Sequence, residues 1–175
     1  MRSYELIRSG RKTLSLEITR DGTVLVRAPL RMPRSSIDTF VREKEEWIAR
    51  KKGLCARRIA FEKANFGTPE QLAALTEKAR RILPQKTEEW AHIMGVSPAG
   101  IRISQAKTRF GSCSATNCIS YSCRLMAYPE DAVDYVVVHE LAHIRHKDHS
   151  PAFYAFVARF LPDYRRREAI LRPKD

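Results

Sequence analysis

Long apolar runs are missing from this chain of 175 residues. Its most apolar stretches, such as residues 136–138, are far shorter than the roughly 20 residues that span a bilayer. Residues 1–20 alternate charged and apolar side chains and contain no continuous apolar segment of the kind a secretory signal requires. These absences exclude a transmembrane helix and favour a cytoplasmic protein without a membrane partner.

Cysteine is also scarce, with four residues and no C-x-x-C pair. So few cysteines do not form a disulfide scaffold, and we expect reduced thiols. Cys113, Cys118 and Cys123 share one short segment, so a second metal site there is conceivable. Their spacing, with four residues between neighbours, does not match common zinc knuckles.

Acidic residues are outnumbered, 20 against 32 Lys and Arg, and the formal net charge is +12. Residues 1–83 hold 19 basic and 10 acidic side chains, whereas residues 84–175 hold 13 and 10. A basic N-terminal half is typical of nucleic-acid contact, but a solvated helix surface is the simpler explanation of it. The remaining composition, with 43% hydrophobic and 30% charged residues, indicates one globular domain.

Three short segments of strand character open the chain, at residues 4–7, 13–18 and 23–28. The turn dipeptides Ser9-Gly10 and Asp21-Gly22 separate them, which predicts an N-terminal β-meander.

Helical periodicity follows, beginning near Ser35 and ending at Gly53. A second helix is predicted to run from Pro69 to Met94, with Thr68 as N-cap and a possible break at Pro84. Strands are then predicted at 101–104 and 118–123, and another helix begins at Pro129. We expect those two strands to be neighbours.

The last of these helices contains the string VVVHELAH. His139 and His143 are four residues apart, so they lie about 40° apart around the helix and about 6 Å apart along it. Both imidazoles can therefore reach one zinc ion, and Glu140 is placed to accept a proton from a zinc-bound water. This H-E-x-x-H pattern predicts one catalytic Zn²⁺ per chain.

A catalytic zinc takes three protein ligands, and the third must come from His146 or His149. In an unbroken helix His146 would lie about 10.5 Å from His139 along the axis, too far to share an ion. Ser150-Pro151 resembles the start of a new helix, so the chain can turn before it and return His149 to the metal. We assign the third ligand to His149.

The spacing H-E-x-x-H-x5-H matches the ligand register of metzincins, except that His146 stands where those enzymes have a glycine. The turn must therefore be built without glycine's freedom at positive φ. His146 itself is either solvent-facing near a helix end or an outer contact of the metal site or substrate.

The segment KTRFGSCSATNCISYSCRLMAYPEDAVDYVVVHELAHIRHKDHSPAFY resembles the signature block of the YgjP-like metallopeptidases, relatives of the WLM and SprT-like zinc proteases. The opening strands and the segment APLRMPRSSIDTFVREKEEWI follow in the same order as in that family. The resemblance implies an α+β fold of the minimal zincin type, combining the N-terminal strands, a small sheet and an H-E-x-x-H helix. It also implies that His139, His143 and His149 bind zinc and that Glu140 is the catalytic carboxylate.

On this basis we expect a single domain, 1–175, made of N-terminal strands (1–30), a helical part (35–94) and a zinc-binding catalytic core (99–160). The expected function is hydrolysis of peptide bonds in a protein or peptide substrate by a zinc-activated water, with Glu140 as general base and then as acid to the leaving amine.

Further site candidates come from the surrounding residues. A strand at the cleft edge can bind extended peptide by strand addition, and our candidate is Asn117, Cys118, Ile119 and Ser120. Tyr154 could donate to the oxyanion, although an aromatic pair at a helix start more often packs in the core.

Asp134 and Asp148 could orient a ligand imidazole, and Asp148 could equally cap a helix. Lys107, Arg109 and Ser112 lie in a basic segment that could contact substrate or form a structural loop. Gly111 is expected to allow a turn there.

Two alternatives remain open at this stage. The protein could be a DNA-associated protease or a nucleic-acid-binding zinc protein that uses its basic N-terminal half. It could also be a non-catalytic zinc protein, but Glu140 argues against this because a structural site is usually closed by a fourth ligand. The sequence leaves the oligomeric state open.

Overall fold

The computed structural model describes residues 4–171, which form a mixed α+β fold. The chain divides into two compact units, with the boundary between Ala64 and Asn65. The single domain, 1–175, expected from the sequence stays a prediction. None of the helices in the described range has the length and apolar character needed to cross a membrane.

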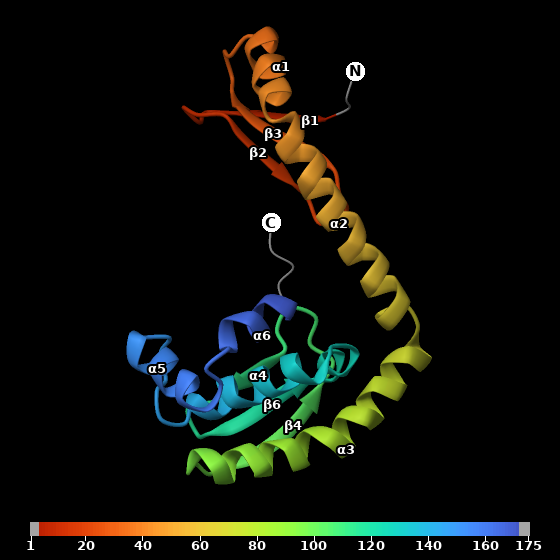
Figure 1. The fold of residues 1–175 in the computed structure, drawn as a ribbon. Coiled ribbons are helices and arrows are strands. Elements are labelled where there is room, and N and C mark those ends of the chain that lie inside the picture. The colour runs from red at the N-terminus through yellow and green to blue at the C-terminus, as the bar shows by residue number, and fades with distance from the viewer. Residues whose placement is uncertain (1–3, 172–175) are drawn as a thin grey trace. The chain divides into compact units, whose positions relative to one another are not determined.

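The first unit contains a three-stranded sheet and two helices (Figure 1). Its elements are β1 (Glu5–Ser9), β2 (Ser15–Ile18), β3 (Val24–Pro29), α1 (Arg34–Glu43) and α2 (Glu45–Phe66), whose last two residues belong to the second unit.

The N-terminal strands do not form the predicted β-meander, because their order is β1-β3-β2. β3 lies in the centre, antiparallel to β2 and parallel to β1. The physical reason is burial, since Val24, Leu25, Val26 and Ala28 of β3 are all buried while β1 is largely exposed. The connection at 10–14 is long enough to cross the two strand spacings, about 10 Å, that separate β1 from β2.

The predicted helix at 35–53 is two helices. α1 ends at Glu43, and α2 begins at Glu45 and continues through Gly53 to Phe66, so the expected stop at Gly53 is wrong. A glycine lowers helix stability without ending a helix when its neighbours are good helix formers. Ile37, Val41 and Ile48 pack against the inner face of the sheet and complete the core of this unit.

The second unit begins with the end of α2 and contains the remaining elements. They are α3 (Pro69–Met94), β4 (Gly100–Ser104), β5 (Gly111–Cys113), β6 (Cys118–Ser122), the 3-10 helix η1 (Cys123–Ala127), α4 (Glu130–Ala142), α5 (Pro151–Phe160) and α6 (Tyr164–Leu171).

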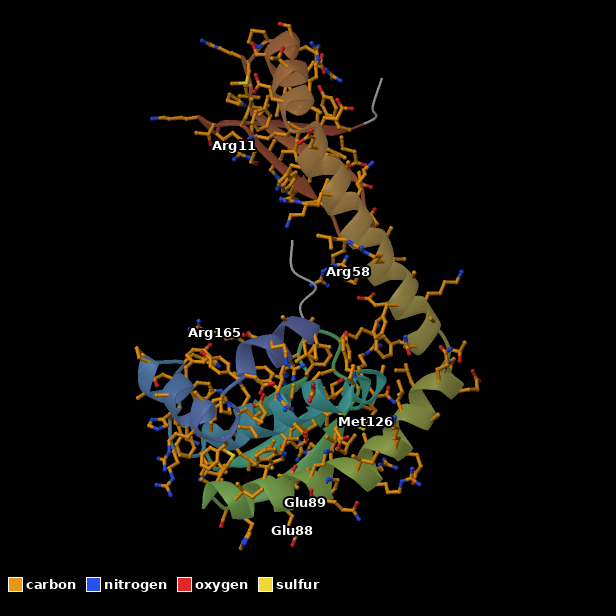
Figure 2. The ribbon with its side chains drawn as sticks, in the orientation of Figure 1. Arg11, Arg58, Glu88, Glu89, Met126 and Arg165 are labelled. Atoms are coloured by element: carbon orange, nitrogen blue, oxygen red, sulfur yellow. The ribbon has the colours of Figure 1, made fainter. Side chains whose placement is uncertain are left out.

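α3 begins and ends as the sequence predicts. The Thr68 hydroxyl accepts from the Gln71 amide while the Gln71 side chain accepts from the Thr68 amide, a complete capping box. Gly95 ends the helix at φ 62°, and Pro84 does not break it. Leu83 and Thr87 face the core, whereas Glu88 and Glu89 point away from it (Figure 2).

The second sheet has the order β4-β6-β5. β4 and β6 are neighbours, as expected, and they run parallel, whereas β6 pairs with β5 in an antiparallel hairpin. The sequence did not predict β5, because three residues are too few to show an alternating pattern.

α4 runs through the centre of the second unit (Figure 1). Nine of its 13 residues are buried, and it contacts α3, α5, α6, η1 and β5. Such a helix is apolar on nearly every side, which fits the run of valines at 136–138. Because it is enclosed by so many elements, its backbone gives a rigid support for the polar residues that follow.

Candidate metal centre and active site

Three histidines converge at the end of α4. His139 lies in the last turn of the helix, His143 is its C-cap, and His149 follows in the connection to α5. Each offers one ring nitrogen, and the three nitrogens lie within 4.8 Å of one another. The Nε2 atoms of His139 and His149 are 3.1 Å apart.

The chain reverses direction after α4, and this reversal brings His149 back to His139. No residue in the reversal has a left-handed backbone. The amides of Ile144, Arg145 and His146 donate to carbonyls three or four residues earlier, so α4 ends in tight turns. Among the non-glycine residues that the structure describes, Asn117 alone has a positive φ. His146 therefore adopts an ordinary backbone conformation and does not need the freedom of glycine. Ser150 caps α5 by accepting from the Phe153 amide, as its sequence predicts.

The outer nitrogens of two histidines have partners. His143 Nδ1 lies 3.0 Å from the His146 carbonyl oxygen, an acceptor, so this nitrogen carries the proton. His139 Nδ1 lies 3.4 Å from the Tyr135 hydroxyl. The proton on His143 Nδ1 leaves the Nε2 atom of that ring as an electron-pair donor, and the Nε2 atoms of His139 and His149 face each other. Burial also lowers the pKa of His143, which favours the neutral ring that a metal ligand must have.

Phe153 packs against all three histidine rings. Its fully buried ring lies 4.9 Å from the His139 ring, 4.6 Å from that of His143 and 5.0 Å from that of His149, centroid to centroid. One aromatic side chain of α5 therefore contacts all three imidazoles.

Glu140 follows His139 and lies under β5, with 6% of its surface exposed. Burial raises the pKa of Glu140 to about 8, while the charge of Arg109 opposes the increase. A carboxyl group that holds a proton near neutral pH suits a group that must both accept and release one.

A cavity of about 400 Å³ opens beside His139 and Glu140. Its walls combine the segment before β5, the outer side of α4 and the last residues of α6, including Phe110, Tyr135 and Leu171. His139 and Glu140 are therefore accessible to a ligand from this side.

The candidate substrate strand needs a correction. β6, which contains Cys118, Ile119 and Ser120, is the central strand, so β4 and β5 already occupy both its edges. The edge strand nearest Glu140 is β5. Asn117 belongs to the turn before β6, at φ 61°, and its side chain accepts from Lys147 at 2.5 Å.

Several other candidates have structural contacts. The Tyr154 ring stacks on Tyr164 and packs against the core, although it also lies 6.1 Å from the His149 ring. Asp134 accepts from Lys86 at 2.8 Å and from the Trp90 indole at 3.3 Å, and so does not orient an imidazole.

Asp148 and His146 act locally. A hydrogen bond from Ser150 lowers the pKa of the Asp148 carboxyl, which places Asp148 at the start of α5. His146 contributes its backbone carbonyl to His143, while its ring packs near Phe156 at 5.6 Å. The three candidates of the basic segment 107–112 have different surroundings. Ser112 lies in β5, Arg109 lines the cavity and Lys107 is exposed.

The cysteines do not form a second metal site. Within residues 4–171, the only group of three or more potential metal ligands is the cluster of His139, His143 and His149. All four cysteines are free thiols.

The donor set of the cluster fits zinc. Two nitrogens bound tetrahedrally to one ion at roughly 2.0–2.1 Å lie about 3.3 Å apart, close to the 3.1 Å between His139 and His149. Three neutral imidazoles are typical ligands of catalytic zinc, and they leave a coordination position for water or substrate.

Tyr135 and Phe153 are the residues at this site that the motif did not reveal. Tyr135 is four residues before His139, so its position on the same helix face was a usable signal. Phe153 is four residues after His149, but only the folded chain shows that it contacts all three rings.

The solved structures that match the chain include two metallopeptidase zymogens, and no curated protein sequence matches it. Abylysin of Pyrococcus abyssi is 20% identical, with a TM-score of 0.46 over 54% of this chain and 98% of that one. Jannalysin of Methanocaldococcus jannaschii is 17% identical, with a TM-score of 0.47 over 52% and 94%. The model of the family described as "YgjP-like, metallopeptidase domain" matches residues 12–78 and 70–174. The chain belongs to the YgjP-like metallopeptidase-domain family.

Proposed function

We propose that this protein is a zinc-dependent peptidase in which His139, His143 and His149 hold the metal and Glu140 transfers the proton. The observation that carries the proposal is the cluster itself. Three ring nitrogens lie within 4.8 Å of one another, and a buried carboxyl group lies next to the first of them. A zinc ion held there would supply Lewis acidity that polarises a peptide carbonyl and activates water, and its charge would favour the ionised form of Glu140.

Glu140 performs the proton transfer. In its ionised form it accepts a proton from the attacking water, and it then donates that proton to the nitrogen of the leaving amine. Its burial keeps bulk water from competing for the proton. The positive charge of Arg109 near the carboxyl group favours the ionised form at the start of the cycle.

The substrate binds along β5 as an added strand. The Ser122 amide donates to the Phe110 carbonyl at 2.8 Å, and the Ser114 amide donates to the Cys118 carbonyl at 2.9 Å. Hydrogen-bonded pairs alternate in an antiparallel ladder, so the N–H and C=O groups of Gly111 and Cys113 point away from β6. These groups can pair with an extended peptide that passes over Glu140.

The test compares metal content and cleavage on the same samples of the full chain. We expect one zinc per chain in the wild type and in Glu140→Gln, and loss of zinc in His143→Ala. Cleavage of casein should be lost in both variants, because the first lacks the proton acceptor and the second lacks the metal. A wild-type chain that binds no zinc when purified without chelator contradicts the proposal.

A second candidate function is nucleic-acid binding by the first unit. Residues 50–63 of α2 contain six basic side chains and one acidic side chain, Glu62. Arg58 donates to the Arg20 carbonyl at 2.7 Å and so lies toward the β2–β3 turn (Figure 2). Arg50, Lys52 and Arg57 are exposed and form no ion pair within the part of the chain that the structure describes. Such cations are free to pair with phosphates.

Salt dependence tests this candidate. Binding of single-stranded DNA should weaken as salt rises, and replacement of Arg50, Lys52 and Arg57 by alanine should reduce the slope by roughly 0.7 per lost phosphate contact. The matched control removes the same charge from the second unit, at Arg102, Arg159 and Arg165. Equal losses in the two triple variants would indicate a net-charge effect, and would count against a binding face on α2.

A further inference from the structure

Gly111, the first residue of β5, lies against the Glu140 side chain. A Cβ atom added at this glycine would be 2.5 Å from Glu140 Oε1, 2.6 Å from its Cγ and 2.7 Å from its Cδ. Real Cβ atoms essentially never approach other heavy atoms within 3.0 Å. The Glu140 carboxyl group therefore occupies the space that a side chain at residue 111 would need.

The backbone of Gly111 does not itself require glycine. The glycines with positive φ in the described part of the chain are Gly22 and Gly95, so the expectation that Gly111 serves a turn is wrong. Gly100, in β4 of the same sheet, gives a useful contrast. A Cβ there would lie 3.7 Å from Cys118 Sγ, an ordinary contact.

Neither partner of this contact has room to move as a whole. Val137, Val138 and Leu141, the neighbours of Glu140 in α4, are fully buried, so the helix cannot shift without disturbing the core. β5 is paired to β6 at Gly111, Ser112 and Cys113. A side chain at residue 111 would therefore be accommodated by rotation of the Glu140 side chain away from its present position.

We propose that Gly111 is a positioning residue for catalysis, because its missing side chain fixes where the Glu140 carboxyl group lies between α4 and β5. The inference rests on the proposed function, in which Glu140 transfers the proton. Gly111 would then set two positions, that of the Glu140 carboxyl group and that of the substrate, because its backbone also faces the edge where substrate is proposed to pair. Base and substrate are thereby held at a fixed separation.

The first experiment measures kcat, KM and zinc content for Gly111→Ala and for the control Gly100→Ala. We expect Gly111→Ala to keep one zinc per chain and to lose about 100-fold in kcat, the order of effect of displacing a catalytic group by 1 Å. KM should change far less, because the outward backbone groups of residue 111 remain. Gly100→Ala should match the wild type. An unchanged kcat in Gly111→Ala overturns the proposal.

The second experiment is independent of catalysis. The thermal unfolding midpoint of the metal-free full chain is compared for Gly111→Ala in the wild-type background and in a Glu140→Ala background. We expect a clear decrease in the first background and little or none in the second, where no carboxyl group opposes the new methyl group. Equal decreases would show that the new methyl group meets a different neighbour, and would overturn the proposal.

The two experiments separate the proposals. If the wild type cleaves no peptide, the proposed function fails, but the unfolding comparison still decides whether Gly111 acts through Glu140. If Gly111→Ala does not fold, a folded Gly111→Ala/Glu140→Ala double variant supports the inference. If neither folds, the inference is overturned.

Discussion

Each histidine of the proposed metal site has a neighbour outside the H-E-x-x-H motif that limits its orientation. Tyr135 contacts the Nδ1 atom of His139, the His146 carbonyl accepts from His143, and Phe153 contacts all three rings. Contacts of this kind fix the tautomer and direction of a ligand, and their removal typically costs 10–100-fold in metal affinity.

Tyr135→Phe tests the contact to His139 at the scale of one hydroxyl group. We expect zinc affinity to fall by about tenfold, because the His139 ring loses the partner of its Nδ1 atom while its packing is retained. Competition with a chromogenic chelator measures the affinity. Tyr164→Phe, which removes a hydroxyl group that bonds Arg165, is the control and should leave zinc affinity unchanged. Equal affinities of Tyr135→Phe and wild type would exclude an orienting role.

Glu140→Gln tests the raised pKa of the buried carboxyl group in metal-free protein. A folded pKa of about 8, above the ordinary value of 4.5, means that the folded state holds the proton more tightly than the unfolded state. This stabilising contribution is complete below the unfolded pKa and is lost as the pH rises toward 8. The wild-type unfolding midpoint should therefore fall between about pH 5 and pH 8 relative to that of Glu140→Gln, whose amide does not titrate. Parallel pH profiles for the two proteins would refute the assignment.

At the scale of elements, the site depends on the order α4, turn, α5. α4 supplies two histidines from a buried helix, and the tight turns at its end allow His149 to return. α5 then places Phe153 beneath the three rings, with Ser150 capping its start. The packing of α5 thus contributes to the proposed metal site as well as to the core.

Phe153→Leu separates these two contributions of α5. Both Phe153 and Val157 are fully buried, but Phe153 contacts the imidazoles. We expect Phe153→Leu and Val157→Ala each to cost about 1–3 kcal/mol of unfolding free energy. Zinc affinity of the folded protein should fall only in Phe153→Leu, as measured by chelator competition. A similar fall in Val157→Ala would show that affinity simply follows core stability.

At the scale of the whole molecule, the chain has two hydrophobic cores. The first unit has a core of its own around Val26 and Ile37, and the second unit has a larger core around Val137 and Phe153. The histidine cluster, Glu140 and β5 all belong to the second unit. Metal binding should therefore stabilise that unit selectively.

Calorimetry of the full chain tests this division. We expect two unfolding transitions, one of which shifts to higher temperature with zinc by mass action. Val26→Ala, a cavity in the first core, should lower the other transition and leave the zinc-dependent one in place. A single transition that responds to both changes would show that the two units unfold as one.

Much of the site was predictable because its signals are local in sequence. The spacing of His139, Glu140 and His143 on one helix fixes their relation, and Ser150-Pro151 marks a helix start that lets His149 return. The capping box at Thr68 and the glycine at 95 set the ends of α3 for the same reason, since a helix end depends on a few adjacent residues.

What the sequence by itself determined is therefore most of the local elements and the proposed ligands. Tertiary structure alone decided which strand is central in each sheet, since pairing depends on long-range burial, and so corrected both the β-meander and the substrate strand. It also decided that Phe153 touches three histidines and that Gly111 leaves room for Glu140. Such contacts depend on how separate elements pack together, which no periodic pattern of side chains within one element can encode.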